Sequence, residues 1–308
     1  MKPVILDVDT GIDDAMAIGY ALNAPELDVI GITTCFGNGT VEHTTRNTLQ
    51  VLDLFERAHI PVYPGASAPL VREAREAPIW IHGSNGLADI TLAAPTQSPK
   101  NIPAHEFLIA SIKERPGDVT VIATGSLTNI AIAIKKAPEI VPLMKELIIM
   151  GGAVHVPGNV TPYAEANIYA DPEAAEIVLQ SGARITLIGL DVTMQAVLKE
   201  SQLAIWQQQN TPASAFLAEA CAFYMNAYRI SSPELGGCAL HDPLAVGVAI
   251  DPTFVTTSSM PIYVDTTGDT LGQTKPLDSA DPTRERITVC TDVAADRFVE
   301  HFLQRTAK

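Results

Sequence analysis

Four aspartates lie within eight residues near the start of the chain, in the segment Asp7–Asp14. On a strand, Asp7 and Asp9 point to the same face, because side chains alternate with a period of two. Asp13 and Asp14 fall where a helix would begin, and the helix dipole favours negative charge there. Taken alone, that second pair could simply cap a helix. With Asp9 held nearby by a glycine turn, the summed charge calls for a counter-ion, and oxygen-only ligands suit Ca²⁺ or Mg²⁺ rather than zinc.

Three known motifs overlap this acidic segment. An EF-hand loop needs glycine at its sixth position and glutamate at its twelfth, but counting from Asp7 these positions hold Ile12 and Ile18. Haloacid-dehalogenase-type phosphatases carry Asp-x-Asp-x-Thr after a strand, and here Gly11 stands in the place of the threonine. A magnesium-dependent phosphatase with Asp7 as nucleophile therefore stays an alternative. The third motif, Asp-x-Asp-x-Gly-x-Asp-Asp-Ala, is matched at every fixed position in the nine residues that end at Ala15.

Short apolar, β-branched runs alternate with longer helical patterns along the chain. The predicted strands are Val4–Val8, Leu27–Thr34, Ile60–Tyr63, Val119–Ala123, Leu147–Met150 and Ile185–Leu190. The predicted helices are Ala15–Asn23, Glu42–Ala58, Ala104–Lys113, Leu127–Lys136 and Pro172–Ser181. This alternation predicts one α/β domain over residues 1–308, with a mostly parallel, doubly wound (Rossmann-like) sheet and helices on both faces.

Polar residues follow most of the predicted strands. The segments concerned are Asp7–Asp14, Cys35–Gly39, Thr124–Asn129, Gly151–Ala153 and the single residue Asp191. In open α/β sheets, ligands bind at the carboxyl ends of the strands. Glycine, asparagine, threonine and aspartate at that edge therefore predict a site for a polar ligand.

Composition narrows the classes of partner. The chain has 308 residues, 47% of them hydrophobic and 18% charged, and a formal net charge of −15. That charge repels phosphate backbones and anionic lipids, so we expect neither nucleic acid nor a membrane as partner. The four cysteines are widely separated and form no CxxC pair, and neither a signal-peptide stretch nor a membrane-length apolar run is present. A cytoplasmic protein with reduced thiols is the expectation.

With the acidic motif in place, the sequence closely resembles the inosine–uridine-preferring nucleoside hydrolase family, nearly end to end. Further matching segments follow in the same order: Phe36–Asn38, His82–Gly83, Thr124–Asn129, Met150–Gly152, Gly158–Asn167 and His241–Pro243. The resemblance implies calcium-dependent hydrolysis of the N-glycosidic bond of ribonucleosides to ribose and free base. It also implies a homodimer or homotetramer, by analogy alone. A non-catalytic nucleoside- or ribose-binding protein is the second alternative.

The resemblance also assigns a metal site. The implied Ca²⁺ ligands are Asp9, Asp14, Asp242 and the main-chain carbonyl of Thr124, with two ribose hydroxyls and one water completing the shell. Ca²⁺ accepts six to eight oxygens, so protein, sugar and water can share it. The water then attacks the anomeric carbon while Asp9 takes its proton as general base.

The remaining implied residues bind the nucleoside. The ribose 2′- and 3′-hydroxyls fall to Asp13 and Asn167, the 5′-hydroxyl to Asn159 and Glu165, and the floor near the anomeric carbon to Asn38 and Met150. Carboxylates and amides suit sugar hydroxyls, which both donate and accept hydrogen bonds. The carboxylates would also favour the positive charge that builds on the ribose ring.

The leaving base needs a proton donor. His241, next to Asp242, occupies the family's position for this acid, and His82 is a second candidate that could instead only contact the substrate. Tyr224 and Tyr228 lie four residues apart on one face of a predicted helix, where they either pack in the core or approach the base. Of these two, Tyr228 is the favoured substrate contact. Purine or pyrimidine preference is left open.

Overall fold

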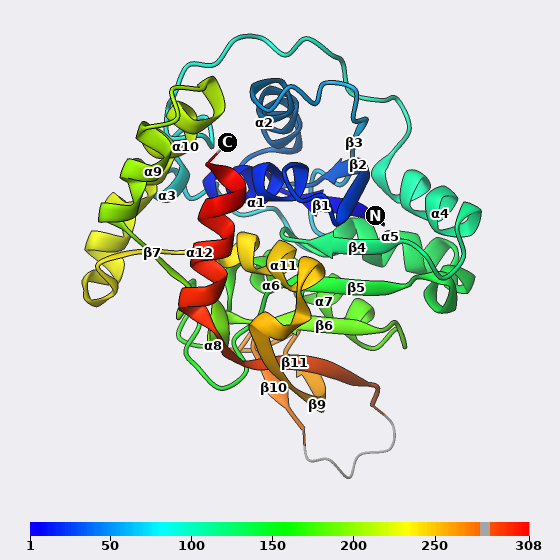
Figure 1. The fold of residues 1–308 in the computed structure, drawn as a ribbon. Coiled ribbons are helices and arrows are strands. Elements are labelled where there is room, and N and C mark those ends of the chain that lie inside the picture. The colour runs from blue at the N-terminus through cyan, green and yellow to red at the C-terminus, as the bar shows by residue number, and fades with distance from the viewer. Residues whose placement is uncertain (278–283, 308) are drawn as a thin grey trace.

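The computed structural model describes residues 1–277 and 284–307. Within them, nine strands form one sheet in the order β10-β9-β11-β6-β5-β4-β1-β2-β3 (Figure 1). The strands are β1 (Lys2–Val8), β2 (Leu27–Thr34), β3 (Val62–Pro64), β4 (Thr120–Ala123), β5 (Glu146–Met150), β6 (Ile185–Ile188), β9 (Val255–Val264), β10 (Thr274–Pro276) and β11 (Arg286–Val293). Pairing is parallel from β3 across to β11, and β9 runs antiparallel to both β11 and β10. A separate antiparallel pair joins β7 (Val197–Lys199) to β8 (Gly237–Ala239).

Helices cover both faces of the sheet. They are α1 (Ile12–Leu22), α2 (Val41–Leu54), α3 (Ile79–His82), α4 (Ala104–Glu114), α5 (Thr128–Lys136), α6 (Ala166–Ala170), α7 (Pro172–Leu179), α8 (Leu190–Thr193), α9 (Ala204–Gln207), α10 (Pro212–Ser231), α11 (His241–Ile250) and α12 (Ala295–Thr306). Short 3-10 helices lie at Pro138–Leu143, Glu200–Leu203, Pro233–Leu235 and Pro252–Phe254. No helix among the described residues is long and apolar enough to cross a bilayer.

The two-residue period of the strands builds two apolar cores. Val4 and Leu6 of β1 point into the core shared with α1, α2, α10, α11 and α12, whereas Ile5 points into the core shared with α4, α5 and α7. The side chains of β5 alternate in the same way: Ile148 lies in the first core and Leu147 in the second. Strands buried on both faces are therefore apolar throughout, as expected for a parallel sheet.

The predicted fold class, a mostly parallel doubly wound α/β sheet, is confirmed, and the boundaries of single elements shift by a few residues. The helix predicted to reach Ala58 ends at Leu54, because Glu56 turns the chain with a positive φ of 57°. The strand predicted to reach Leu190 ends at Ile188, because Gly189 caps the N-terminus of α8, which begins at Leu190. The antiparallel edge formed by β9, β10 and β11 was not predicted, and in Figure 1 it lies at the opposite side of the sheet from β3.

Candidate active site

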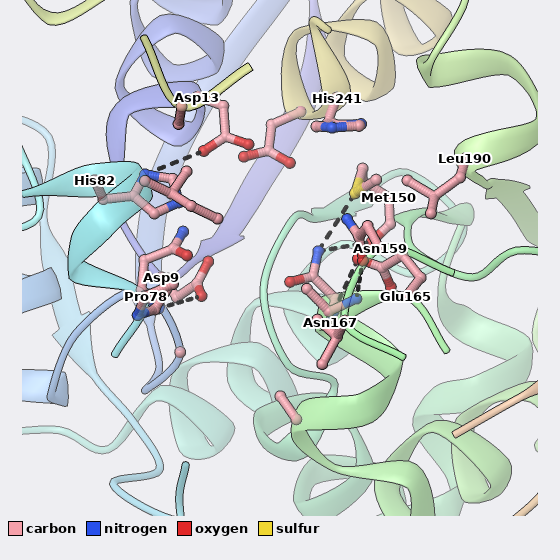
Figure 2. Close-up of a pocket in the computed structure, with 18 of the residues that line it drawn as sticks. Asp9, Asp13, Pro78, His82, Met150, Asn159, Glu165, Asn167, Leu190 and His241 are labelled. Atoms are coloured by element: carbon pink, nitrogen blue, oxygen red, sulfur yellow. Dashed lines mark hydrogen bonds and ion pairs between the residues drawn. The ribbon is translucent and has the colours of Figure 1, made fainter. Parts of the chain in front are cut away.

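A cavity of about 390 Å³ opens at the carboxyl edge of the parallel strands. That volume lies in the range of small-molecule pockets. Every residue that the sequence singled out for the site lines this cavity except Asp14, which is fully buried directly behind the lining. Figure 2 shows Asp9, Asp13 and His82 on one side, with Asn167 and Glu165 facing them across the cavity. The fold thus gathers the predicted residues from segments far apart in the sequence.

Three carboxylates converge at one wall of the cavity. We call these three side chains and that of Asp9 the acidic floor. Oxygens of Asp13, Asp14 and Asp242 all lie within 4.8 Å of one another. The first two occupy the first turn of α1 and the third the first turn of α11, two helices that pack together. The prediction that Asp13 and Asp14 open a helix is confirmed, although α1 starts at Ile12 rather than Ala15. Asp14 also accepts a 2.9 Å hydrogen bond from the Gly11 amide, as a helix cap does.

Asp9 lies at the end of β1, beside the three convergent carboxylates, and the backbone after β2 fixes it in place. The Asn38 amide donates to its Oδ2 at 2.8 Å, and the Asn38 side chain donates to Asp14 at 3.2 Å. A Cβ on Gly37, whose φ is +156°, would lie only 1.9 Å from the same Oδ2. Only glycine therefore allows the chain to pass this close to the carboxylate.

Burial and mutual repulsion strain the acidic floor electrostatically. Desolvation, with like charges nearby, raises the pKa of Asp9 and of Asp242 well above the usual range. Desolvation likewise raises the pKa of Asp13 and of Asp14 to about 6. Among the described residues, Oδ1 of Asp9 and Oδ1 of Asp13 are buried without a hydrogen-bond partner. An all-oxygen donor set with orphaned carboxylate atoms fits a hard divalent cation, which would supply the missing partner.

The residues expected around the ribose also organise the backbone. Glu165 caps α6 by accepting from the amides of Asn167 and Ile168, and its second oxygen also takes the Gly152 amide. The Asn167 side chain donates to the Thr124 carbonyl at 2.7 Å and to the Met150 carbonyl at 3.1 Å. Thr124 in turn donates its hydroxyl to Asp14 at 2.7 Å. The Thr124 carbonyl retains a second lone pair for another partner.

Asn159 and Met150 complete this side of the cavity. The Asn159 side-chain oxygen accepts from the Ala166 amide at 3.0 Å, which joins the loop after β5 to the start of α6. Met150 ends β5 and is buried, with its sulfur 3.4 Å from the Asn167 amide nitrogen. This side of the cavity is therefore built from one carboxylate and two amides that are anchored to the backbone, together with one buried apolar residue.

The opposite end of the cavity, which we call the base end, carries hydroxyls and imidazoles instead of carboxylates. Nε2 of His241 lies 2.6 Å from the Tyr228 hydroxyl, and Nδ1 lies 2.7 Å from the Thr193 hydroxyl. The Tyr224 hydroxyl donates to Asp13 at 3.2 Å and lies 3.5 Å from that of Tyr228. A continuous row of hydrogen-bonding groups thus runs from the acidic floor to α8.

His82 sits between the two ends. Its Nδ1 accepts from the Ile12 amide at 3.2 Å, which leaves the ring proton on Nε2, and its ring stacks on Tyr224 with centroids 5.6 Å apart. Burial lowers the pKa of His82 and of His241 to about 4. Both rings are therefore neutral imidazoles at neutral pH.

Sequence reasoning missed two residues of this site. Thr193 contacts His241, and its signal was position, since it follows shortly after Asp191 beyond the end of β6. Asp191, which the sequence did place at this edge, holds the loop after β5 by accepting from the Val154 and His155 amides. Trp80 lines the cavity at its rim with 57% of its surface exposed, and no local pattern marked it.

Residues 4–300 match the family model described as inosine-uridine preferring nucleoside hydrolase. The chain belongs to this family. It is 38% identical over 273 residues to uridine nucleosidase 1 of Arabidopsis thaliana, covering 89% of this chain and 81% of that protein. It is 39% identical over 306 residues to the pyrimidine-specific ribonucleoside hydrolase RihA of Salmonella arizonae, covering 98% and 97%. The solved purine-preferring ribonucleoside hydrolase from Gardnerella vaginalis superposes with a TM-score of 0.95 at 42% identity, covering 99% and 98%.

Family membership confirms the resemblance found in the sequence. The protein is a nucleoside hydrolase, a ribonucleoside N-ribohydrolase acting on ribonucleoside substrates. The magnesium-dependent phosphatase and the non-catalytic binding protein, the two alternatives that the sequence left open, are therefore set aside.

Proposed function

We propose that this nucleoside hydrolase uses one Ca²⁺ ion, held by Asp9, Asp14, Asp242 and the Thr124 carbonyl, with Asp9 as general base. The observation that carries the proposal is the acidic floor, where buried carboxylates converge and two of their oxygens have no partner among the described residues. When bound, such a cation would hold ribose hydroxyls and make a neighbouring water more acidic. Calcium is favoured over magnesium because the donors come from three separate segments of the chain, and Mg²⁺ demands a stricter octahedron.

Asp9 is suited to accept the proton of the attacking water. Its Oδ2 is engaged by the Asn38 amide at 2.8 Å, so its orientation is fixed, while its Oδ1 has no partner within the described chain. As the water oxygen bonds to the anomeric carbon, the carbon–nitrogen bond breaks and its electron pair leaves with the base. One water proton passes to Oδ1 of Asp9, and the departing base gains a proton at its own end of the cavity.

The ribose is oriented by residues that the fold already holds rigidly. We assign the 2′- and 3′-hydroxyls to Asp13 and Asn167, and the 5′-hydroxyl to Asn159 and Glu165. Oδ1 of Asp13 is the second orphaned oxygen, which makes it available to accept a hydroxyl proton. Asn38 and Met150 form the floor beneath the anomeric carbon. Carboxylates around this point favour the positive charge that the ring develops as the bond breaks.

At the base end, His241 acts as the donor to the leaving base through or beside Tyr228. The 2.6 Å contact between them supports a shared proton path rather than two independent roles. His82 is the second candidate, because its ring proton is on Nε2 and its Nδ1 is committed to the Ile12 amide. A neutral imidazole donates its proton effectively only as the base acquires negative charge, which happens late in bond cleavage.

The substrate proposal is limited to ribonucleosides as a class. The relatives are described as uridine, pyrimidine-specific and purine-preferring at nearly equal identity, so identity alone favours none of these bases. A homodimer or homotetramer is proposed from the family resemblance. A cytoplasmic location is proposed as well, supported by four buried cysteines that are free thiols.

The test is release of free base from a panel of purine and pyrimidine ribonucleosides, measured with added Ca²⁺ and with a calcium chelator. We expect base release in calcium and none in excess chelator, with recovery when calcium is restored. The matching 2′-deoxyribonucleosides should react much more slowly, since they lack a hydroxyl assigned to the cation and Asp13. Undiminished activity in chelator would remove the cation from the mechanism, and equal rates on deoxyribonucleosides would remove the assignment of the 2′-hydroxyl.

A further inference from the structure

His241 is held between two hydroxyl groups, one on each ring nitrogen. The Tyr228 oxygen lies 2.6 Å from Nε2 on the cavity side, and the Thr193 oxygen lies 2.7 Å from Nδ1 on the far side. Tyr228 and His241 line the cavity, whereas Thr193 is fully buried and does not reach it. Thr193 can therefore affect the substrate only through the histidine.

The direction of the Thr193 hydrogen bond follows from its burial. Within the described residues, the Thr193 hydroxyl has one hydrogen-bond partner, Nδ1 of His241. If Nδ1 carried a proton, it would donate to the hydroxyl oxygen, and the hydroxyl's own proton would be buried with no acceptor. Buried polar hydrogens are rarely left in that state. The hydroxyl therefore donates to Nδ1, which carries no proton, so the proton of the ring lies on Nε2.

The turn that carries Thr193 is anchored independently of His241. Asp191 accepts from the Val154 amide at 2.9 Å and the His155 amide at 2.7 Å, and the Leu190 amide donates to Gly152 at 2.8 Å. Just after this turn, the Ala196 carbonyl accepts from the Leu240 amide at 2.8 Å, directly before His241. Backbone bonds on both sides thus fix the distance between the hydroxyl and the imidazole.

We propose that Thr193 is a positioning residue for departure of the base: its hydroxyl donates to Nδ1 of His241 and keeps the ring proton on Nε2. This inference rests on the proposed role of His241. In that tautomer Nε2 donates to the Tyr228 oxygen, so the phenolic proton of Tyr228 is free to point into the cavity. Tyr224 already donates to Asp13, so the phenolic proton of Tyr228 is not needed to satisfy that carboxylate and can serve the leaving base.

The first test reads the tautomer directly. In protein with ¹⁵N-labelled histidine and added calcium, the His241 signals are identified by their loss in His241→Gln. We expect Nδ1 of the wild type to show the shift of an unprotonated nitrogen and Nε2 that of a protonated one. In Thr193→Val, which removes the hydroxyl at nearly constant volume, we expect averaging toward a mixture of tautomers. A protonated Nδ1 in the wild type would overturn the proposal.

The second test separates the leaving group from the rest of the reaction. For Thr193→Val we expect kcat on natural ribonucleosides to fall about 10- to 100-fold, at most the lower limit of what acid–base catalysis contributes, because His241 itself is retained. On 4-nitrophenyl riboside, whose leaving phenolate needs no proton, kcat should change less than about threefold by the same reasoning. KM should change little, and Thr193→Ser should restore most of the lost rate.

The matched control is Thr306→Val. Thr306 is also buried and also uses its hydroxyl, accepting from Trp206 and donating to Phe302 away from the cavity. Thr306→Val should lower the stability of the protein without changing the ratio of kcat on natural ribonucleosides to kcat on 4-nitrophenyl riboside. Equal losses on both substrates in Thr193→Val, or failure of serine to restore the rate, would overturn the positioning role. If the wild type released no base at all, the proposed function would fail, and the ¹⁵N shifts alone would decide whether Thr193 sets the tautomer.

Discussion

The acidic floor and the base end of the cavity are built on opposite principles. The floor gathers four buried carboxylates whose pKa values are all raised by desolvation, and it can be neutralised only by a cation or by protons. The base end contains neutral hydroxyls and imidazoles that satisfy one another in a row from Thr193 to Tyr224. The floor is thus incomplete without a ligand, whereas each hydroxyl and imidazole in the row at the base end already has a hydrogen-bonding neighbour. In the proposed mechanism, the floor supplies the chemistry at the ribose and the base end controls departure of the base.

The two ends also differ in what holds them. Asp9 lies at the end of β1 and Asp14 at the start of α1, and a backbone amide fixes each of the two carboxylates. The base end depends on α3, α8, α10 and α11, which come together only in the folded protein, and its rim is exposed at Trp80. Backbone anchoring suits a site that must keep its geometry to better than an ångström. A rim of exposed side chains suits a site that can accept bases of different size.

The largest effect should come from removing the cation. A chelator should abolish base release and lower the midpoint of thermal unfolding, because the floor is then left with unneutralised carboxylates. A ligand present at 100 times its dissociation constant stabilises the folded state by about 2.7 kcal/mol. Differential scanning fluorimetry with a calcium titration checks this. Asp14→Asn should lose most of the calcium-dependent shift, while Asp28→Asn, exposed on β2, should keep it. A full shift in Asp14→Asn would break the link between the floor and calcium.

Asp9→Asn should have the next largest effect. Asparagine keeps an oxygen for the Asn38 amide but cannot take a proton, so kcat should fall about 10³- to 10⁴-fold, the upper part of the range for a general base. Rates are measured at saturating calcium, because the substitution also weakens a proposed ligand. In calcium-free buffer the unfolding midpoint should not fall, since a buried charge has been removed. A loss of less than tenfold would show that the proton goes elsewhere.

A smaller and more selective effect is expected at the base end. His241→Ala should reduce kcat on inosine by about 10²-fold, in the range of general acid catalysis, while 4-nitrophenyl riboside should lose far less. Steady-state kinetics on both substrates, with His82→Ala in parallel, identifies which imidazole serves the leaving base. If His241→Ala slows both substrates equally, His241 holds the site together rather than donating a proton. If only His82→Ala slows inosine more than 4-nitrophenyl riboside, His82 rather than His241 is the proton donor.

The acidic floor and the base end also differ in how much of each could be predicted from the sequence. Asp13 and Asp14 follow Asp9 within one turn, so strand period and helix dipole were enough to place them on one wall. His241 was identified only through its neighbour Asp242 and the family resemblance. Thr193 escaped because its contact with His241 spans 48 residues and depends on how α8 packs beside α11. β9 to β11 were missed in turn because an antiparallel edge lacks the strand–helix alternation on which the prediction relied.

The smallest effect should lie at the rim, with Trp80→Ala. The indole is 57% exposed and lines the mouth of the cavity, where it can cover a bound base but touches no reacting atom. Contact of an aromatic side chain with the base should contribute about 0.5–1.5 kcal/mol to binding, which raises KM about 2- to 10-fold when it is lost. Because that contact is present before and during bond cleavage, kcat should stay nearly constant. The matched control is Ile205→Ala, a partly exposed apolar residue on α9 outside the cavity, which should change neither constant. A tenfold fall in kcat for Trp80→Ala would mean that the rim takes part in departure of the base, and the division between the two ends of the cavity would then have to be redrawn.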